Sequence, residues 1–144
     1  MVQHQSYANH GRRPPLLFLG GCYGATAVAV FFGFELVTDF QAETLALFLV
    51  SASAATGLLF ARRFSTGVQD RVIRLEERIR MERILPDDLK GHIEELTTDQ
   101  LIGLRFASDG ELPRLVRLVL DGELGNRKAI KQAIKSWRAD HQRI

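Results

Sequence analysis

Two long stretches without a charged side chain constrain this chain more than any other feature. The first covers the 19 residues from Leu16 to Phe34, and the second covers the 18 residues from Thr44 to Ala61. A helix rises about 1.5 Å per residue, so each stretch matches a hydrocarbon core of roughly 30 Å. We therefore expect transmembrane helices at 16–34 and 44–61. The alternative is a buried helical pair in a soluble protein, which seldom needs helices this long and unbroken.

The charges around these stretches predict an orientation. Arg12 and Arg13 precede the first stretch, Arg62 and Arg63 follow the second, and the short loop at 35–43 carries three acids and no base. All 19 Lys and Arg residues then fall on one side of the membrane. By the positive-inside rule, both termini are expected in the cytoplasm and the loop outside.

Other uses of the first stretch stay open at this point. Alternating alanines from Ala25 to Ala29 follow a basic start, as in a cleavable signal peptide. The segment 19–22 resembles a lipoprotein processing box, in which Cys22 would be acylated. The pair at 12–13 is too weak to indicate twin-arginine export. Cys22 is the one cysteine of the chain, and we interpret it as a small apolar residue inside a helix.

Small residues recur every four positions in both stretches, so that each helix carries a ridge where another backbone can approach closely. We interpret the ridges as the packing surface between the two helices. Association with another copy or with a different membrane protein is the alternative. The candidate packing residues are Gly21, Ala25, Ala29, Gly33, Ser53 and Gly57.

The segment 62–85 predicts an amphipathic linker helix. Val68, Val72, Leu75 and Ile79 follow 4,3,4 spacing and form an apolar stripe among charged pairs. We expect this stripe to dock on the rest of the domain, because two heptads are few for a coiled coil; dimerisation is the alternative. The pattern leaves open whether the helix continues the second span or restarts at a capping box from Thr66 to Gln69.

The segment 86–144 predicts a small all-helical domain. Helix start signals stand at 86–88, at Thr97 with Gln100, at Ser108 with Glu111, and at Asn126. Apolar residues at 112–119 and 130–137 follow helical spacing and can close a core with Leu96, Leu101, Leu104 and Phe106. We expect residues 1–15 to form a flexible cytosolic arm, which ends with two prolines.

Residues that could carry chemistry are few. His4, His10, His92 and His141 belong to no metal-ligand motif, although His92 has Glu95 three residues on. The sequence lacks a recognisable nucleophile setting and a phosphate-binding loop. We therefore expect no cofactor, no metal and no enzymatic activity, with an unrecognised enzyme using His92 as the alternative.

The most suggestive surface is a basic cluster near the C-terminus, with no acid between Glu123 and Asp140. Its spacing places most of the cations on one helix face, opposite Ile130, Ile134 and Trp137. Such a helix favours anionic lipid headgroups or an acidic protein partner, and nucleic acid is not expected. The candidate contact residues are Arg127, Lys128, Lys131, Lys135 and Arg138.

Several longer segments resemble a family of small uncharacterised bacterial two-span membrane proteins, classed as a domain of unknown function. These segments lie at Gln5–His10, Val68–Pro86, Leu96–Val116 and Ala129–His141, with RLEERIR and LRFASDGELP the most specific. The resemblance implies the same topology in a bacterial inner membrane, without an activity.

The expected fold class is all-α: a two-helix transmembrane hairpin followed by a small cytosolic helical domain. The expected function is a membrane-anchored interaction module with lipid or protein partners, a second copy included. An accessory subunit of a larger membrane complex is the alternative.

Overall fold

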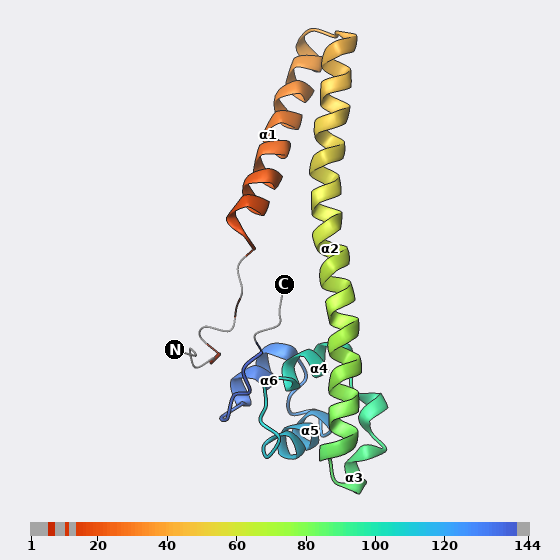
Figure 1. Ribbon diagram of the computed structural model, residues 1–144, viewed down its shortest axis with the longest axis vertical. Coiled ribbons are helices and arrows are strands. Elements are labelled where there is room, and N and C mark those ends of the chain that lie inside the picture. The colour runs from red at the N-terminus through yellow and green to blue at the C-terminus, as the bar shows by residue number, and fades with distance from the viewer. Residues whose placement is uncertain (1–5, 8–10, 12–13, 141–144) are drawn as a thin grey trace. The chain divides into compact units, whose positions relative to one another are not determined.

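A computed structural model describes residues 6–7, 11 and 14–140 (Figure 1). Most of the expected arm, including His4, His10, Arg12 and Arg13, lies outside the described residues, as does His141. The chain divides into one unit of residues 13–66 and another that contains residues 67–144. The described residues are helical, apart from loops and one isolated β-bridge.

Helix α1 spans Leu16–Thr38. The prolines before it have no N–H group, so they leave no unpaired donor where the helix begins. The N–H of Leu19 donates to the carbonyl of Pro15. The helix ends four residues later than the uncharged stretch, where Asp39 turns to an extended conformation and its N–H returns to Glu35. None of the residues of α1 is buried.

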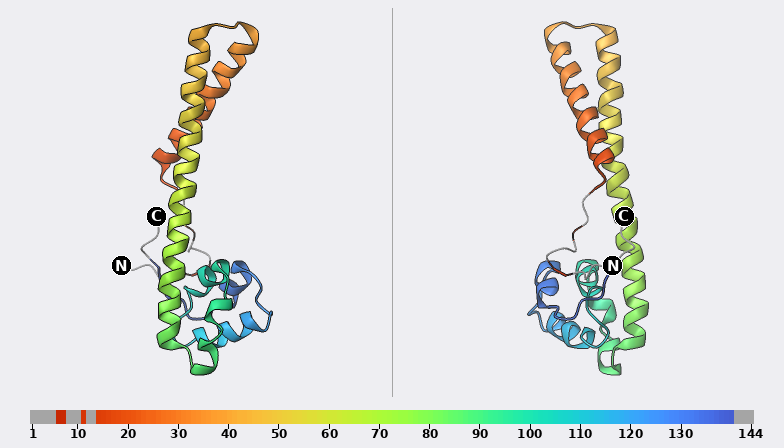
Figure 2. Two further views of the ribbon diagram at one scale, coloured as in Figure 1. Left: turned by 90° about the vertical axis from the view of Figure 1, so that its right-hand side faces the viewer. Right: turned by 60° about the vertical axis from the view of Figure 1, so that its left-hand side comes forward.

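Helix α2 spans Ala42–Ile84, 43 residues without interruption, and its ribbon is continuous in Figure 2. The second apolar stretch and the amphipathic segment are therefore a single helix. The capping box suggested at Thr66 does not form. The Thr66 hydroxyl instead donates to the carbonyls of Arg62 and Arg63 inside the helix.

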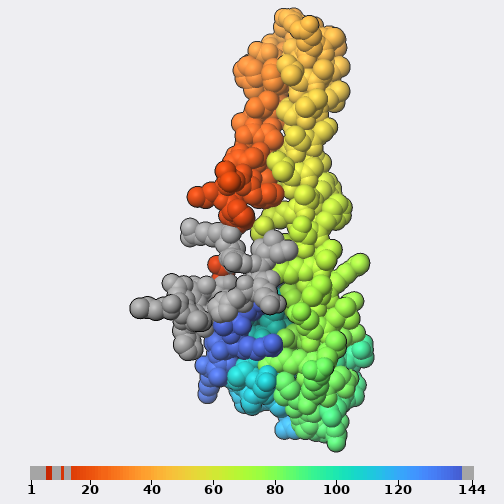
Figure 3. All heavy atoms as spheres, in the orientation of Figure 1, coloured from red at the N-terminus to blue at the C-terminus, as the bar shows by residue number. Residues whose placement is uncertain are grey.

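Within residues 13–66, α1 and the first half of α2 run in opposite directions and touch (Figures 1 and 3). A Cβ at Gly33 would lie 3.2 Å from the ring of Phe48, and one at Gly21 would lie 3.7 Å from Leu58. Both helices are long and apolar enough to cross a membrane, by length and composition.

Four short helices and one 3-10 turn close a core beside the second half of α2 (Figure 1). They are α3 at Asp87–Lys90, η1 at Ile93–Glu95, α4 at Thr98–Leu104, α5 at Leu112–Leu120 and α6 at Arg127–Ala133. Thr97 and Gln100 form the expected capping box of α4, and the Asn126 side chain caps α6. The core contains Met81, Leu85, Leu101, Leu104, Phe106, Leu112, Leu115 and Ile130.

The second half of α2 docks on this core through a different face from the one we expected. Ile73, Glu77 and Met81 are buried, whereas the stripe Val68, Val72, Leu75 and Ile79 is 46 to 60% exposed. The expectation that the stripe packs on the domain is wrong. The domain contacts the opposite side of the helix, where Met81 and Leu85 enter the core together.

The last helix is shorter than the spacing of its apolar residues suggested. It ends at Ala133, and Ile134 adopts an extended conformation. The following segment pairs with the loop after α4: Ser108 donates its N–H to Ser136, and Arg138 donates its N–H to Phe106. Ile130, Ile134 and Trp137 still reach the core, but not as one helical face.

Candidate interaction site

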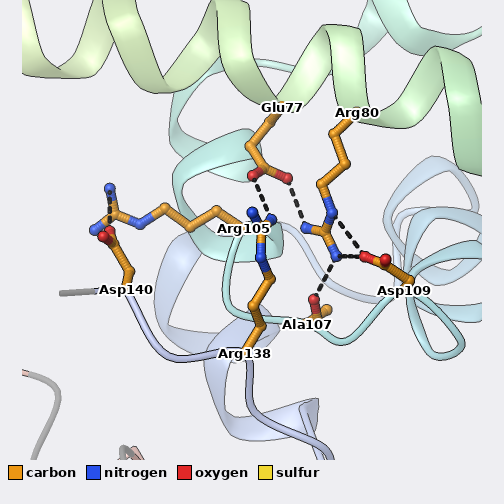
Figure 4. Close-up of polar contacts among 7 residues, drawn as sticks. All are labelled: Glu77, Arg80, Arg105, Ala107, Asp109, Arg138 and Asp140. Atoms are coloured by element: carbon orange, nitrogen blue, oxygen red, sulfur yellow. Dashed lines mark hydrogen bonds and ion pairs between the residues drawn. The ribbon is translucent and has the colours of Figure 1, made fainter. Parts of the chain in front are cut away.

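A groove of about 950 Å³ lies along the second half of α2, inside the C-terminal unit. One wall is α2 itself, from Gln69 to Ile84, and the other comes from Arg105, Asp109 and residues 138–140. Charged side chains of both signs and branched apolar side chains line it together. Figure 4 shows the ion pairs at its base.

Glu77 is the central residue of this groove, 5% exposed although it is ionisable. Its two carboxylate oxygens accept hydrogen bonds from Arg80, at 2.8 Å, and from Arg138, at 3.3 Å (Figure 4). A buried charge requires such partners, because an unpaired one costs several kcal/mol. Glu77 therefore ties α2 to the C-terminal segment, 61 residues further along the chain.

Arg80 extends the network to the loop after α4. Its guanidinium donates to Asp109 through Nε at 2.9 Å and through Nη2 at 2.5 Å, and Nη2 also donates to the carbonyl of Ala107 at 2.7 Å. The planar guanidinium satisfies these acceptors and Glu77 at once, which an ammonium group could not do in the same geometry. Arg80 therefore joins α2 to the loop at 107–109.

Arg105 forms the other end of the groove. It is 5% exposed, its guanidinium carbon lies 4.5 Å from the centre of the Phe106 ring, and its Nη1 lies 3.5 Å from Asp140 (Figure 4). The ammonium of Lys131 approaches the same ring at 4.9 Å. Cations stack favourably on aromatic faces, more so where water is excluded, so Phe106 stabilises two buried positive charges.

Glu111 positions the segment that brings Arg138 to the groove. Its carboxylate accepts N–H bonds from Lys135 and Ser136 and a bond from Arg114. Burial by itself would raise the pKa of Glu111, but the bonds from Ser136, Arg114 and Lys135 together lower it below its usual value. The ionised carboxylate thus holds residues 135–136 against the start of α5.

The chemistry that this groove offers is recognition by charge and by apolar contact. The described lining residues include no Ser, Thr, Cys or His side chain, and no group of three or more metal-ligating side chains occurs among the described residues. His92 lies elsewhere, with its ring nitrogen 2.8 Å from Glu95 and its side chain half exposed.

The five basic residues predicted as one contact face have different environments. Arg127 binds Asp99 through its backbone and side chain, Lys131 is buried beside Phe106, and Arg138 pairs with Glu77. Lys128 and Lys135 are exposed. The expected common face does not form, because Lys131 is buried against Phe106 and because the helix stops at Ala133, before Lys135 and Arg138.

The predicted packing residues also divide into two groups within residues 13–66. Gly21 and Gly33 face the side chains of α2. Ser53 and Gly57 are exposed, and Ser51 takes the buried place on α2 instead. The ridge of α1 therefore contacts α2 at Gly21 and Gly33, with Ala25 and Ala29 partly exposed between them, while Ser53 and Gly57 on α2 face outward.

Glu77, Arg80 and Arg105 are the site residues that sequence reasoning missed. Glu77 stands four residues from both Ile73 and Met81, which is the spacing of one helix face. A charged residue on the same helix face as two apolar residues could have indicated a buried ion pair from the sequence. Arg105 has little local signal, because beyond the adjacent Phe106 it depends on Asp140, 35 positions further on.

The architecture defines an all-helical protein with two long apolar helices and a small helical domain. The chain belongs to a family of unknown function (DUF6526), whose model matches residues 1–144. The expected membership of a family without a known function is thereby confirmed. The comparisons with curated proteins and with solved structures gave no match.

Proposed function

We propose that this protein is a membrane-anchored, non-enzymatic interaction module. Its transmembrane hairpin consists of α1 and the first half of α2, and the domain from residue 67 onward lies at the cytoplasmic face of a bacterial inner membrane. The observation that carries the proposal is the exposure of the apolar helices. The most apolar window of α1 is 0% buried and that of α2 is 11% buried, so their own chain does not cover them as it would in a soluble core.

The charges support this orientation. The residues between α1 and α2 include Asp39 and are flanked by Glu35 and Glu43, while Arg62 and Arg63 follow the apolar part of α2. Basic residues stay on the cytoplasmic side. Lys128 and Lys135, both exposed, are then the cations available to anionic headgroups or to an acidic partner, and the groove at Glu77 and Arg80 is the recognition site for a protein segment.

Cysteine accessibility tests the topology. In a Cys22→Ala background, Gln41→Cys reports on the loop between the helices and Lys128→Cys reports on the domain. We expect an impermeant maleimide to label position 41 in cells with a permeabilised outer envelope, and position 128 only after the inner membrane is opened. The reverse pattern, or protein in the soluble fraction after high-speed centrifugation, would refute the proposal.

An accessory subunit of a larger membrane complex is the second candidate, and the outward-facing Ser53 and Gly57 favour it. Small residues on an exposed helix face allow a neighbouring helix to approach closely. Gly57→Leu should then release the protein from co-purifying membrane proteins in mild detergent. Gly24→Leu, at an exposed glycine with open space on α1, is the matched control, and retention of the complex in the Gly57 variant would count against this candidate.

A further inference from the structure

The second half of α2 carries an apolar stripe that its own domain leaves uncovered. The exposed fractions are 60% for Val68, 46% for Val72, 56% for Leu75 and 53% for Ile79. The buried residues Ile73, Glu77 and Met81 occupy the other side of the helix. At 100° per residue the two sets lie on opposite sides of α2. The described residues of the domain therefore leave the stripe exposed, although Val72 and Ile79 also line the edge of the groove.

We propose that this stripe is a seam along which two copies of the chain associate as a parallel two-stranded coiled coil. The 4,3,4 spacing assigns Val72 and Ile79 to heptad position a, and Val68 and Leu75 to position d. β-Branched residues at a with leucine at d favour two strands over three or four, and Val72, Ile79 and Leu75 follow this rule whereas Val68 does not. The choice of apolar residues thus indicates a second helix of the same kind.

Charges beside the seam support a second copy in parallel orientation. Arg71 occupies position g and Glu76 the following position e, and both are exposed. In a parallel pair, position g of one helix faces the next position e of the other, so Arg71 faces the partner's Glu76. Two-fold symmetry gives this attraction twice. An antiparallel pair would instead bring g positions together, Arg71 against the partner's Arg78.

The next heptad has like charges at the corresponding positions, Arg78 and Arg83. Arg78 is already paired within the chain, 2.8 Å from Glu94, which reduces the repulsion. The second heptad therefore weakens the seam without excluding it.

The seam is short, about 17 Å from Val68 to Ile79 at 1.5 Å per residue. Coiled coils that form freely in solution usually need three or four heptads. Two copies held in one membrane are already parallel and locally concentrated, which strengthens a weak contact. This step rests on the proposed membrane anchoring.

Disulfide crosslinking in native membranes tests the contact. In the Cys22→Ala background, Leu75→Cys places a thiol in the seam, and Lys128→Cys places one on an exposed part of the domain. Mild oxidation should convert the Leu75 variant to a covalent dimer at least several-fold more efficiently than the Lys128 variant. Equal crosslinking at both positions, or none at position 75, would overturn the proposal.

A charge exchange identifies the partner as a second copy. In the full chain, Arg71→Glu should lower the dimer fraction about fivefold, since it turns two attractive pairs into repulsive ones. Adding Glu76→Arg to the same chain should restore it. Fluorescence of Trp137 verifies that each variant keeps its domain folded. A double variant that stays monomeric, or a crosslink to a different protein, would show that the seam does not join two copies.

Fractionation of the same samples separates the two proposals. Protein that pellets with membranes but does not crosslink would refute the seam and leave the anchoring intact. Protein found in the soluble fraction would refute the anchoring. Crosslinking of the Leu75 variant in that fraction would still support the seam, and its absence would refute the seam.

Discussion

At the scale of single residues, hydrogen bonds to ionised side chains fix the C-terminal segment. Glu111 shows this most directly, because one carboxylate accepts two backbone N–H groups and one guanidinium. Such bonds contribute roughly 1.5 to 3 kcal/mol each when the acceptor is charged. The residue is therefore a sensitive point for stability and for its dependence on pH.

We expect Glu111→Gln to lower the free energy of unfolding by about 2 kcal/mol at pH 7. The lowered pKa of Glu111 in the fold means that the carboxylate stabilises the protein above its unfolded pKa, near 4.5, and that this contribution is lost as the pH falls through the folded pKa. Urea titration of the full chain in detergent, read from Trp137 fluorescence, should show a smaller loss in acid for the variant. Glu123→Gln, at an exposed glutamate, is the control. A variant as acid-sensitive as the wild type would contradict the argument.

Gly103 allows α4 and α6 to approach closely. A Cβ at this position would lie 3.1 Å from two carbons of Ile130, a residue with 0% exposure. Gly103→Ala should therefore destabilise the domain by about 1 to 3 kcal/mol through overpacking. Gly91→Ala, at a helical φ with open space around it, should be neutral or slightly stabilising. Equal effects of the two substitutions on urea unfolding would refute the close-approach argument.

At the scale of elements, ion pairs help hold the buried face of α2 against the domain, beside Met81 and Leu85 in the core. Arg80 joins Glu77, Ala107 and Asp109 and is 10% exposed at its side chain. Arg80→Leu leaves Glu77 with Arg138 alone, and breaking a buried pair in this way costs about 3 kcal/mol. Arg83→Leu, at an exposed arginine on the same helix, should change the free energy of unfolding by less than about 0.5 kcal/mol. Chemical denaturation of both variants measures the difference.

Local signals in the sequence predicted the starts of α3, α4 and α6. The capping box expected at Ser108 with Glu111 does not form, because α5 begins at Leu112 without a side-chain cap. Nonlocal contacts limited the rest. The caps at Thr97 and Asn126 depend on atoms three residues away, so their residue types suffice. The prediction of the buried face of α2 was wrong because the apolar pattern of that face is interrupted by Glu77. The partner of Glu77, Arg138, lies 61 residues away. The end of α6 was misplaced for a similar reason, since residues 136–138 bond to the loop at 106–108.

At the scale of the whole molecule, the chain joins two units whose stability has different origins. The C-terminal unit depends on a packed core around residues such as Met81 and Phe106. In the proposed membrane setting, the apolar helices keep their backbone hydrogen bonds because no water competes for them. Denaturant should therefore act on the two units separately.

We expect urea to unfold the full chain in detergent micelles in two parts. Fluorescence of Trp137, which packs 5.1 Å from Phe106, should report one cooperative transition, while much of the helical circular dichroism signal persists beyond it. Met81→Ala opens a cavity at a residue with 0% exposure. It should lower the free energy of unfolding measured by fluorescence by roughly 2 to 5 kcal/mol and leave the residual helicity unchanged. Coincident loss of both signals would mean that the apolar helices depend on the domain for their structure, and the anchor could then not be an independent membrane unit.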